Sequence, residues 1–382
     1  MSLLKKIKIA TVVGTRPEII RLSSIISRLN DSSFIDHYLI HSGQNYDHNL
    51  NEIFFEDLNL NKPDYYLDAA KETSSKTIGE ILIKIDPILD DLKPDAILVL
   101  GDTNSCLSVI AAKKKKIPIF HLEAGNRCFD MRVPEETNRK IVDHISDINL
   151  TYSDIAREHL IQEGIKSDRV IKVGSPMFEV LKKHELKIKN SNILKTLKLK
   201  EKQYILVSCH REENIDYDSN FNNLILCLNK LAEVFKFEII FSTHPRTRKI
   251  IEQKKPKLNN LVKLIEPLGF SDYNNLQINS FVVISDSGTI SEESSILNFK
   301  ALNIRDSHER PEAMEESSVI LTGLNPDRVI QAIDSMKDQD TGSKRNILLV
   351  KDYSIPNVSI KIERIILSYI NYVNRVVWQK ES

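Results

Sequence analysis

The sequence predicts an α/β fold made of two doubly wound, Rossmann-like domains that face each other across a cleft. Short apolar, β-branched runs alternate with helical patterns at the spacing of βαβ units, which implies a parallel sheet with right-handed crossovers. The alternation restarts near residue 204. In addition, a chain of 382 residues is too long for one hydrophobic core.

The composition is typical of a globular protein with no strong overall charge. Hydrophobic residues make up 41% of the chain, and 53 basic residues balance 53 acidic ones, so no global field recruits nucleic acid. The apolar runs are far too short to span a bilayer and no export signal is visible, so we expect a cytoplasmic protein. The four cysteines form no CxxC pair and the ten histidines show no metal-ligand spacing, which predicts reduced thiols and no metal site.

The first half of the chain begins with a β-branched run typical of a buried parallel strand, and Pro17 and Glu18 suit the first turn of the helix after it. Strands are expected at Ile7–Val13, Tyr38–His41, Ala96–Leu100, Ile117–Leu122, Asp147–Tyr152 and Arg169–Val173. Helices are expected from Pro17 to about Asn30, at Thr77–Leu92 with a kink at Asp86-Pro87, and at Pro134–Ile145. A further helix is expected after the strand Asp147–Tyr152 and runs through Glu163.

The charge-rich segment Lys182–Lys202 is expected to bridge the two domains or to form a surface helix. Strands are then expected at Tyr204–Cys209, Phe237–Phe241, Leu261–Ile265, Phe281–Ser285 and Ala301–Ile304, and helices at Asn220–Phe235, Thr289–Leu297 and Pro326–Met336. The tail Ser359–Gln379 has apolar residues at helical spacing, so one of its faces must pack on something. We expect domains at 1–178 and 179–358, with the helix in 359–382 packing back on the first domain.

The stretch from His121 to Arg139 holds four carboxylates, three arginines and a histidine within nineteen residues. Such groups are costly to bury unless they are paired, so they should line a wet cleft. Glu123 lies just past a strand end, where open α/β sheets place their ligands. With Glu135 it flanks a loop that holds arginines, an arrangement that can supply one acid and one base. The alternative is an ion-pair network that holds the loop down, which suits Glu136 and Arg139 better.

Two other strand-end loops of the first half carry candidate groups. Gly14-Thr-Arg16-Pro-Glu18 places an arginine at a helix start, which suits a phosphate, although a plain surface turn is the alternative. Asp102, in Gly101-Asp-Thr-Asn104, is either a general base or the cap of the following helix.

The second half of the chain also carries candidate groups in the loops that follow expected strands. His210 follows a strand and can contact a pyrophosphate or carry a proton, although a single histidine is often structural. Ser287 and Gly288 stand at a helix start that can hold phosphate oxygens, and Glu293 one turn later can accept ribose hydroxyls. The alternative is a Ser-Gly capped helix. Arg310 supplies a further arginine after the next strand.

These motifs together resemble the non-hydrolysing UDP-N-acetylglucosamine 2-epimerases, which have the GT-B fold. The resemblance covers nearly the whole chain and rests on Gly14-Thr-Arg-Pro-Glu18, Gly101-Asp-Thr103, His121-Leu-Glu-Ala-Gly125 with Arg127, Pro134-Glu-Glu136 with Asn138-Arg139, His210-Arg with Glu213-Asn214, Asp286-Ser-Gly288 with Glu292-Glu293, and Glu309-Arg-Pro-Glu312. It implies catalytic roles for Asp102, Glu123, Glu135 and His210. It implies UDP or substrate contacts for Arg16, Arg21, Arg127, Tyr273, Ser287, Gly288, Thr289, Glu293 and Arg310.

At three places the sequence departs from the common family pattern. There it resembles the sequences of the branch that makes UDP-N-acetyl-L-fucosamine from UDP-2-acetamido-2,6-dideoxy-L-talose. Arg21 replaces a lysine, the loop reads Asn-Arg-Cys-Phe-Asp-Met-Arg-Val-Pro, and the strand before His210 ends in Ser-Cys. Phe129 and Met131 would offer an apolar wall to a sugar that lacks its 6-hydroxyl, although an apolar pocket discriminates weakly against one hydroxyl.

The expected chemistry follows from the weak acidity of the proton on C2 of a pyranosyl diphosphate. The absence of a GxGxxG fingerprint weakens a route through NAD, so no cofactor is expected. Expelling UDP to give a 2-acetamidoglycal and then adding it back needs a base on each face of the sugar. We expect a homodimer that supplies surface polysaccharide synthesis. The alternatives are epimerisation of UDP-N-acetylglucosamine to UDP-N-acetylmannosamine, a GT-B glycosyltransferase, a hydrolysing epimerase, and a UDP-sugar sensor without turnover.

Overall fold

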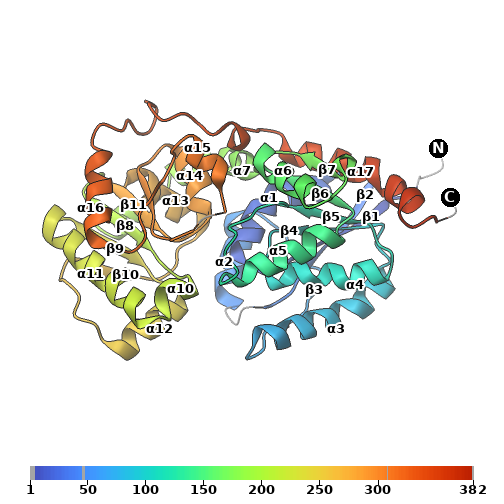
Figure 1. Ribbon diagram of the computed structural model, residues 1–382, viewed down its shortest axis with the longest axis horizontal. Coiled ribbons are helices and arrows are strands. Elements are labelled where there is room, and N and C mark those ends of the chain that lie inside the picture. Colours follow the sequence, from blue (N-terminus) through green and yellow to red (C-terminus); the bar gives the residue numbers. More distant parts are fainter. Residues whose placement is uncertain (1–4, 45–47, 308, 381–382) are drawn as a thin grey trace. The chain divides into compact units, whose positions relative to one another are not determined.

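The computed structural model describes residues 5–44, 48–307 and 309–380 (Figure 1). The chain divides into two compact units, here called the first unit (Met1–Lys182 with Ser354–Ser382) and the second unit (Lys183–Tyr353). The boundaries that the sequence suggests, after residues 178 and 358, lie a few residues from these. The predicted fold class, two parallel-sheet α/β domains, is confirmed.

The first unit contains a seven-stranded sheet in the order β3-β2-β1-β4-β5-β6-β7. Every neighbouring pair in it is parallel. The strands are β1 (Ile7–Val13), β2 (Ile35–His41), β3 (Tyr65–Tyr66), β4 (Ala96–Leu100), β5 (Ile119–Leu122), β6 (Ile148–Thr151) and β7 (Val170–Lys172). The strand order reverses between β1 and β4, and at such a point the carboxyl ends of the strands form a natural ligand site.

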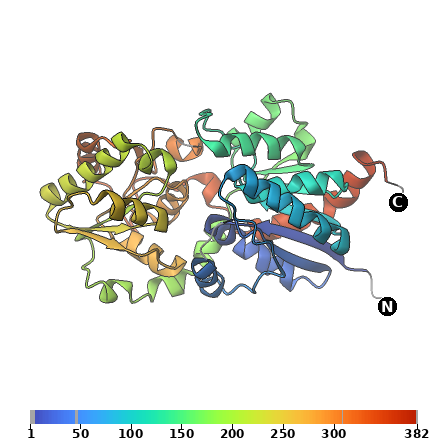
Figure 2. The same cartoon turned by 90° about the horizontal axis from the view of Figure 1, so that it is seen from below.

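Helices lie on both sides of this sheet (Figures 1 and 2). They are α1 (Arg16–Asp31), α2 (His48–Asp57), α3 (Ser74–Leu92), η1 (Asn104–Ser108), α4 (Val109–Lys114), α5 (Pro134–Ile145), α6 (Asp154–Gln162), η2 (Ser167–Arg169), α7 (Met177–Lys183) and α17 (Val358–Val376). Residues of α3 and α4 pack with Val12 and Val99 in one core cluster.

The C-terminal helix α17 packs against α1 of the first unit. The Ser359 backbone N–H donates to Glu179 Oε2 at 2.9 Å, and Arg28 Nε donates to Glu363 Oε2 at 2.7 Å. The apolar stripe of the tail therefore has its partner in the first unit.

The second unit contains a six-stranded parallel sheet in the order β10-β9-β8-β11-β12-β13. Its strands are β8 (Tyr204–Ser208), β9 (Glu238–Ser242), β10 (Val262–Ile265), β11 (Val282–Ser285), β12 (Ala301–Asn303) and β13 (Ile320–Leu321). Its helices are α8 (Glu185–Lys189), α9 (Ile193–Thr196), α10 (Glu212–Ile215), α11 (Asp218–Phe235), α12 (Pro245–Lys254), α13 (Phe270–Asn279), α14 (Thr289–Leu297), α15 (Pro311–Glu315), α16 (Pro326–Ser335) and η3 (Lys351–Tyr353).

Most expected elements lie within a few residues of the observed ones, and some details differ. Pro87 lies inside α3, which runs unbroken from Ser74 to Leu92. The segment Lys182–Lys202 folds into short helices rather than one long surface helix. No helix among the described residues combines the length and apolarity that a membrane span needs.

Candidate functional site

Three neighbouring strand ends of the first unit carry expected site residues. Strand β1 pairs with β4, which pairs with β5, and their carboxyl ends lead to Arg16, Asp102 and Glu123. Because the strands are parallel, the three turns meet at one edge of the sheet. A Cβ at Gly14 would force its neighbours to move, since it would lie 2.2 Å from Ser42 Oγ and 2.9 Å from Ser105 Cβ.

Glu123 is buried beside a cation. Its Oε2 lies 3.0 Å from Nη1 of Arg21, and each side chain is 7% exposed. The amide of Asn126 donates to the other oxygen at 3.4 Å. Glu123 also has a backbone φ of 67°, a left-handed conformation that non-glycine residues adopt mainly at special sites. The charge of this carboxylate is therefore compensated, and its position is fixed.

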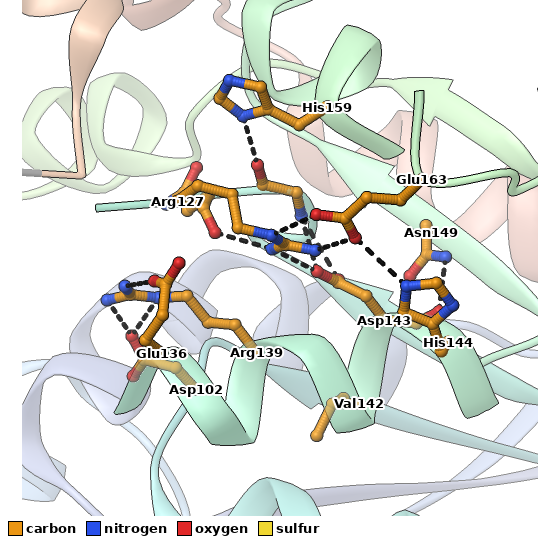
Figure 3. Close-up of polar contacts among 12 residues, drawn as sticks. Asp102, Arg127, Glu136, Arg139, Val142, Asp143, His144, Asn149, His159 and Glu163 are labelled. Atoms are coloured by element: carbon orange, nitrogen blue, oxygen red, sulfur yellow. Dashed lines mark hydrogen bonds and ion pairs between the residues drawn. The ribbon is translucent and has the colours of Figure 1, made fainter. Parts of the chain in front are cut away.

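Asp102 is held by Arg139, as Figure 3 shows: Nε and Nη2 donate to its Oδ2 at 2.9 and 2.6 Å. Nη1 of the same arginine donates to Glu136 Oε2 at 2.8 Å. Glu136 is fully buried and also accepts the backbone N–H groups of Cys128 and Phe129, at 3.1 and 3.3 Å. Burial would raise the pKa of Glu136, but the Cys128 N–H and Arg139 bring it below its usual value. Arg139 thus ties the loop after β5 to the loop after β4.

Arg127 lies in a separate buried cluster of charges (Figure 3). Its Nε and Nη2 make a two-pronged contact with Glu163 at 2.8 and 2.6 Å, while Nη1 donates to Asp143 at 2.7 Å and to the Asn126 carbonyl at 2.7 Å. Asp143 also accepts the Gly125 N–H. All three guanidinium nitrogens therefore bond to protein acceptors. For Arg127 the structure shows the loop-holding network that the sequence left as an alternative.

Two other expected residues of the first unit are partly exposed. Arg16 occupies the first position of α1 and its guanidinium carbon lies 5.6 Å from the centre of the Phe54 ring. Glu135 lies in the first turn of α5 and is half-buried, in contrast to its buried neighbour Glu136.

In the second unit, strands β8 and β11 are neighbours, and one buried carboxylate joins the turns that follow them. Asp286, fully buried after β11, accepts the backbone N–H groups of His210 and Arg211, both at 2.9 Å. The Nδ1 of His210 lies 3.1 Å from Asp286 Oδ1, and its side chain is 39% exposed. Burial would raise the pKa of Asp286, but His210 and these N–H groups lower it well below its usual range. The imidazole is therefore oriented by an anion and still reaches solvent.

The start of α14 carries two hydroxyl groups beside a glycine. Gly288 precedes it, and the Ser287 and Thr289 hydroxyl oxygens lie 3.0 Å apart. Farther along the helix, buried Glu293 accepts a 2.6 Å hydrogen bond from Nε2 of Gln277, on α13. The helix start and the carboxylate belong to one rigid element.

Arg310 and Tyr273 complete the expected set in the second unit. Arg310 is buried, with Nη2 3.4 Å from Glu292 Oε2. Tyr273 is half-buried on α13, where it packs against a core cluster that includes Leu276.

Asp143 and Gln277 have clear structural roles at these loops but were not singled out from the sequence, which named Glu18 only as a helix-start residue and Asp286 only as part of a motif. The spacing of Glu18 after Thr15 is that of a capping box, which was the available signal. Gln277 carries no such signal, because its partner is distant in the sequence.

Among the described residues, no group of three or more His, Cys, Asp or Glu is arranged to hold a metal ion.

Comparisons with known proteins agree with one another. A family model described as UDP-N-acetylglucosamine 2-epimerase matches residues 27–367. A UDP-N-acetylglucosamine 2-epimerase structure from Rickettsia bellii is 47% identical, with a TM-score of 0.90, and covers 98% of this chain and 100% of its own. The Methanocaldococcus jannaschii UDP-GlcNAc 2-epimerase in complex with UDP-GlcNAc and UDP is 35% identical, with a TM-score of 0.86 and coverages of 95% and 100%.

A third relative is named for a different sugar. The UDP-2,3-diacetamido-2,3-dideoxy-D-glucuronate 2-epimerase of Pseudomonas aeruginosa is 32% identical over 328 residues, 85% of this chain and 91% of that protein. The two solved structures have the GT-B-like fold that the sequence predicts, with two parallel-sheet α/β domains.

Proposed function

Since this chain belongs to the UDP-N-acetylglucosamine 2-epimerase family and is an isomerase of the non-hydrolysing type, we propose that it inverts C2 of a UDP-2-acetamido sugar by eliminating UDP and adding it back. The intermediate is a 2-acetamidoglycal. Elimination breaks the C1–O bond and removes the C2 proton, and addition forms the bond again after a proton reaches C2 from the other face. The overall reaction consumes no oxidant or reductant.

The observation that carries this proposal is the pair of carboxylates at adjacent strand ends. Asp102 and Glu123 follow the neighbouring strands β4 and β5, and each is held by a buried arginine. An epimerase needs a proton acceptor and a proton donor on opposite faces of the sugar, so two fixed carboxylates suit the reaction better than one. Glu135 is proposed as a third group that moves a proton.

The departing UDP needs positive charge and N–H donors. In the proposed site, His210, Arg310 and the start of α14 serve the diphosphate, with Ser287, Gly288 and Thr289 at that helix start. Arg16 and Arg21 are proposed to add positive charge near the reacting sugar, and Glu293 to accept the ribose hydroxyls. Tyr273 is proposed to contact the uracil. Arg127 acts in this scheme by holding the loop that carries Glu123.

For the sugar, we propose UDP-2-acetamido-2,6-dideoxy-L-talose as substrate and UDP-N-acetyl-L-fucosamine as product. Phe129 and Met131, in the loop after β5, are 73% and 63% exposed, so they are available as an apolar wall for a 6-methyl group. The alternative substrate is UDP-N-acetylglucosamine, for which two relatives are named.

The test is incubation of the protein with each UDP-sugar in D₂O, followed by NMR of C2. We expect deuterium at C2, a second epimer, and no free sugar or UDP accumulating. The faster of the two substrates identifies the sugar. Transfer of the sugar to an added acceptor with no label at C2 would instead support a GT-B glycosyltransferase.

We also propose a cytoplasmic homodimer that supplies surface polysaccharide synthesis. Light scattering during size-exclusion chromatography should give about twice the chain mass of 43.8 kDa. A mass of one chain at micromolar concentration would refute the dimer.

A further inference from the structure

The buried carboxyl of Glu18 contacts two separate loops of the first unit. Glu18 is the third residue of α1 and only 1% exposed. Its Oε2 accepts the Gly14 N–H at 3.0 Å and the Thr15 hydroxyl at 2.7 Å, both in the turn after β1. Its Oε1 accepts the hydroxyl of Thr103 at 3.0 Å and that of Ser105, both in the loop after β4.

A helix-capping role explains only half of these contacts. A capping-box glutamate reaches back to the start of its own helix, as Oε2 does here. Oε1 points instead to a loop more than eighty residues away, and it takes two hydroxyl donors there. Burying a carboxyl is costly unless hydrogen-bond donors compensate it. Here donors from both loops do so.

The two loops joined in this way carry proposed site residues. Arg16 follows Thr15 directly, and Asp102 precedes Thr103 directly. We propose that Glu18 is a positioning residue, which sets the spacing between the turn of Arg16 and the loop of Asp102 by bonding both through one buried carboxyl. This inference rests on the proposed function for the roles of Arg16 and Asp102, but the linkage itself does not depend on them.

The donor groups around Glu18 differ in whether they can also accept a hydrogen bond. This difference predicts how variants at Glu18 behave. The Gly14 N–H can only donate, so the amide oxygen of Glu18→Gln must replace Oε2. The amide NH₂ then faces Thr103 and Ser105, whose hydroxyls can accept as well as donate. Glu18→Gln therefore keeps the linkage, while Glu18→Ala removes the acceptor of an N–H and of three hydroxyls. The Thr103 and Ser105 hydroxyls can then still bond to each other, but no longer to the carboxyl that joins their loop to the turn after β1.

The first readout is hydrogen exchange, which does not require activity. In Glu18→Ala we expect amide exchange at least tenfold faster in both segments, 13–16 and 101–106, and near wild-type exchange in Glu18→Gln. Ser23→Ala is the matched control, because it removes another buried hydroxyl of α1, which donates to the Ile20 carbonyl at 2.7 Å. It should leave both segments protected.

The second readout is turnover measured as C2 labelling. We expect kcat to fall tenfold or more in Glu18→Ala and less than threefold in Glu18→Gln and Ser23→Ala. If Glu18→Gln is as slow as Glu18→Ala, the carboxyl acts through its charge and the proposal is overturned. Unchanged exchange in Glu18→Ala would also overturn it.

Two further results complete the test. If Glu18→Ala does not fold, Ser105→Ala tests the same linkage from the other loop, with faster exchange in 101–106 expected and wild-type exchange there contradicting the proposal. Failure of the proposed function appears separately, as a wild-type protein that labels no UDP-sugar while the exchange pattern holds.

Discussion

Buried arginines determine what the carboxylates of the first unit are able to do. Arg139 holds Asp102 and Arg21 holds Glu123, each at a strand end. An ion pair of this kind fixes the direction in which a carboxylate points, which a group that transfers a proton to or from a substrate carbon requires. Breaking a buried pair leaves an uncompensated charge, so activity and stability must be measured together.

Replacing Glu123 with glutamine removes the proposed proton-transfer group and changes little else in shape. We expect kcat to fall by about 10²–10⁴, the usual contribution of a general acid or base. Labelling of C2 in D₂O measures it, with urea unfolding to show that the fold is kept. Glu80→Gln is the matched control, since Glu80 is likewise paired with a basic side chain, Lys84, at 3.1 Å. Wild-type turnover in Glu123→Gln would refute the assignment.

Gln277 is expected to act through Glu293. Gln277→Leu removes the buried N–H donor at similar volume, so the proposed ribose contact should loosen. The KM for the UDP-sugar should rise roughly three- to tenfold, within the range that the loss of one ordinary intramolecular hydrogen bond of about 0.5–1.5 kcal/mol predicts, with kcat nearly unchanged. Asn275→Leu is the control, because Asn275 lies on the same helix and donates to the Ile188 carbonyl at 2.8 Å. An equal rise in KM in both variants would indicate a general loss of packing.

His37 is expected to make stability depend on pH. Burial lowers its pKa from 6.5 to about 4 in the folded chain, where its ring nitrogens contact Thr11 and Asn30. Between these values the unfolded chain binds more protons, so the stabilisation is complete above pH 6.5 and is lost as the pH falls toward 4. The loss is about 3 kcal/mol at most. Urea unfolding at pH 7.5 and 4.5 should show a smaller difference for His37→Gln; equal differences would contradict the shift.

At the scale of elements, the loop after β5 is shaped by one close backbone approach. Gly125 has φ of 80°, and a Cβ there would lie 2.2 Å from the carbonyl oxygen of Ala156 in α6. A backbone atom cannot turn aside as a side chain does. The loop that joins Glu123 to α5 therefore requires glycine at this point.

Gly125→Ala should lower the free energy of unfolding by at least about 2 kcal/mol, because both the strained φ and the clash oppose it. Gly79→Ala is the matched control: Gly79 lies in α3 with nothing near its Cβ position. It should raise the stability by up to about 1 kcal/mol. Urea denaturation of both variants measures the difference, and equal values would refute the argument.

The elements that the sequence predicts well are those whose pattern is local. The β-branched run Ile7–Val13 and the segment Pro134–Ile145 were predicted with the bounds they have. Helices α12 and α13 were not predicted, because α12 is strongly charged and α13 buries polar residues such as Asn274 and Gln277 in place of an apolar stripe. The pairing of Arg127 with Glu163 and Asp143 was equally beyond prediction, since it depends on how distant segments fold together.

At the scale of the whole molecule, the same strand order appears in both units. In each sheet the chain starts at an inner strand, moves to one edge, and then crosses to the other side. Most of the proposed site residues follow β1, β4 and β5 in the first unit and β8 and β11 in the second, beside the point where the order reverses, while Tyr273 and Arg310 follow β10 and β12. That repeat was predictable from the restart of the pattern near residue 204. The cores, which involve contacts between distant segments, were not.

The stability of the first unit should depend on α17. Ile366 on this helix is fully buried, so Ile366→Ala should destabilise the first unit by about 2–5 kcal/mol. Val376→Ala, at an exposed position near the end of the same helix, should change stability by less than about 0.5 kcal/mol. Hydrogen exchange should quicken across the first unit of Ile366→Ala and stay unchanged in the second. Faster amide exchange in both units would contradict the division of the chain into two units with separate cores.

The return of α17 to the first unit also imposes an order on synthesis. All seven strands of the first sheet are synthesised before the second unit begins, yet the helix that packs on α1 is made only after Tyr353. The second unit is continuous and can complete its core first. The nascent first unit therefore has an apolar surface uncovered until α17 is made.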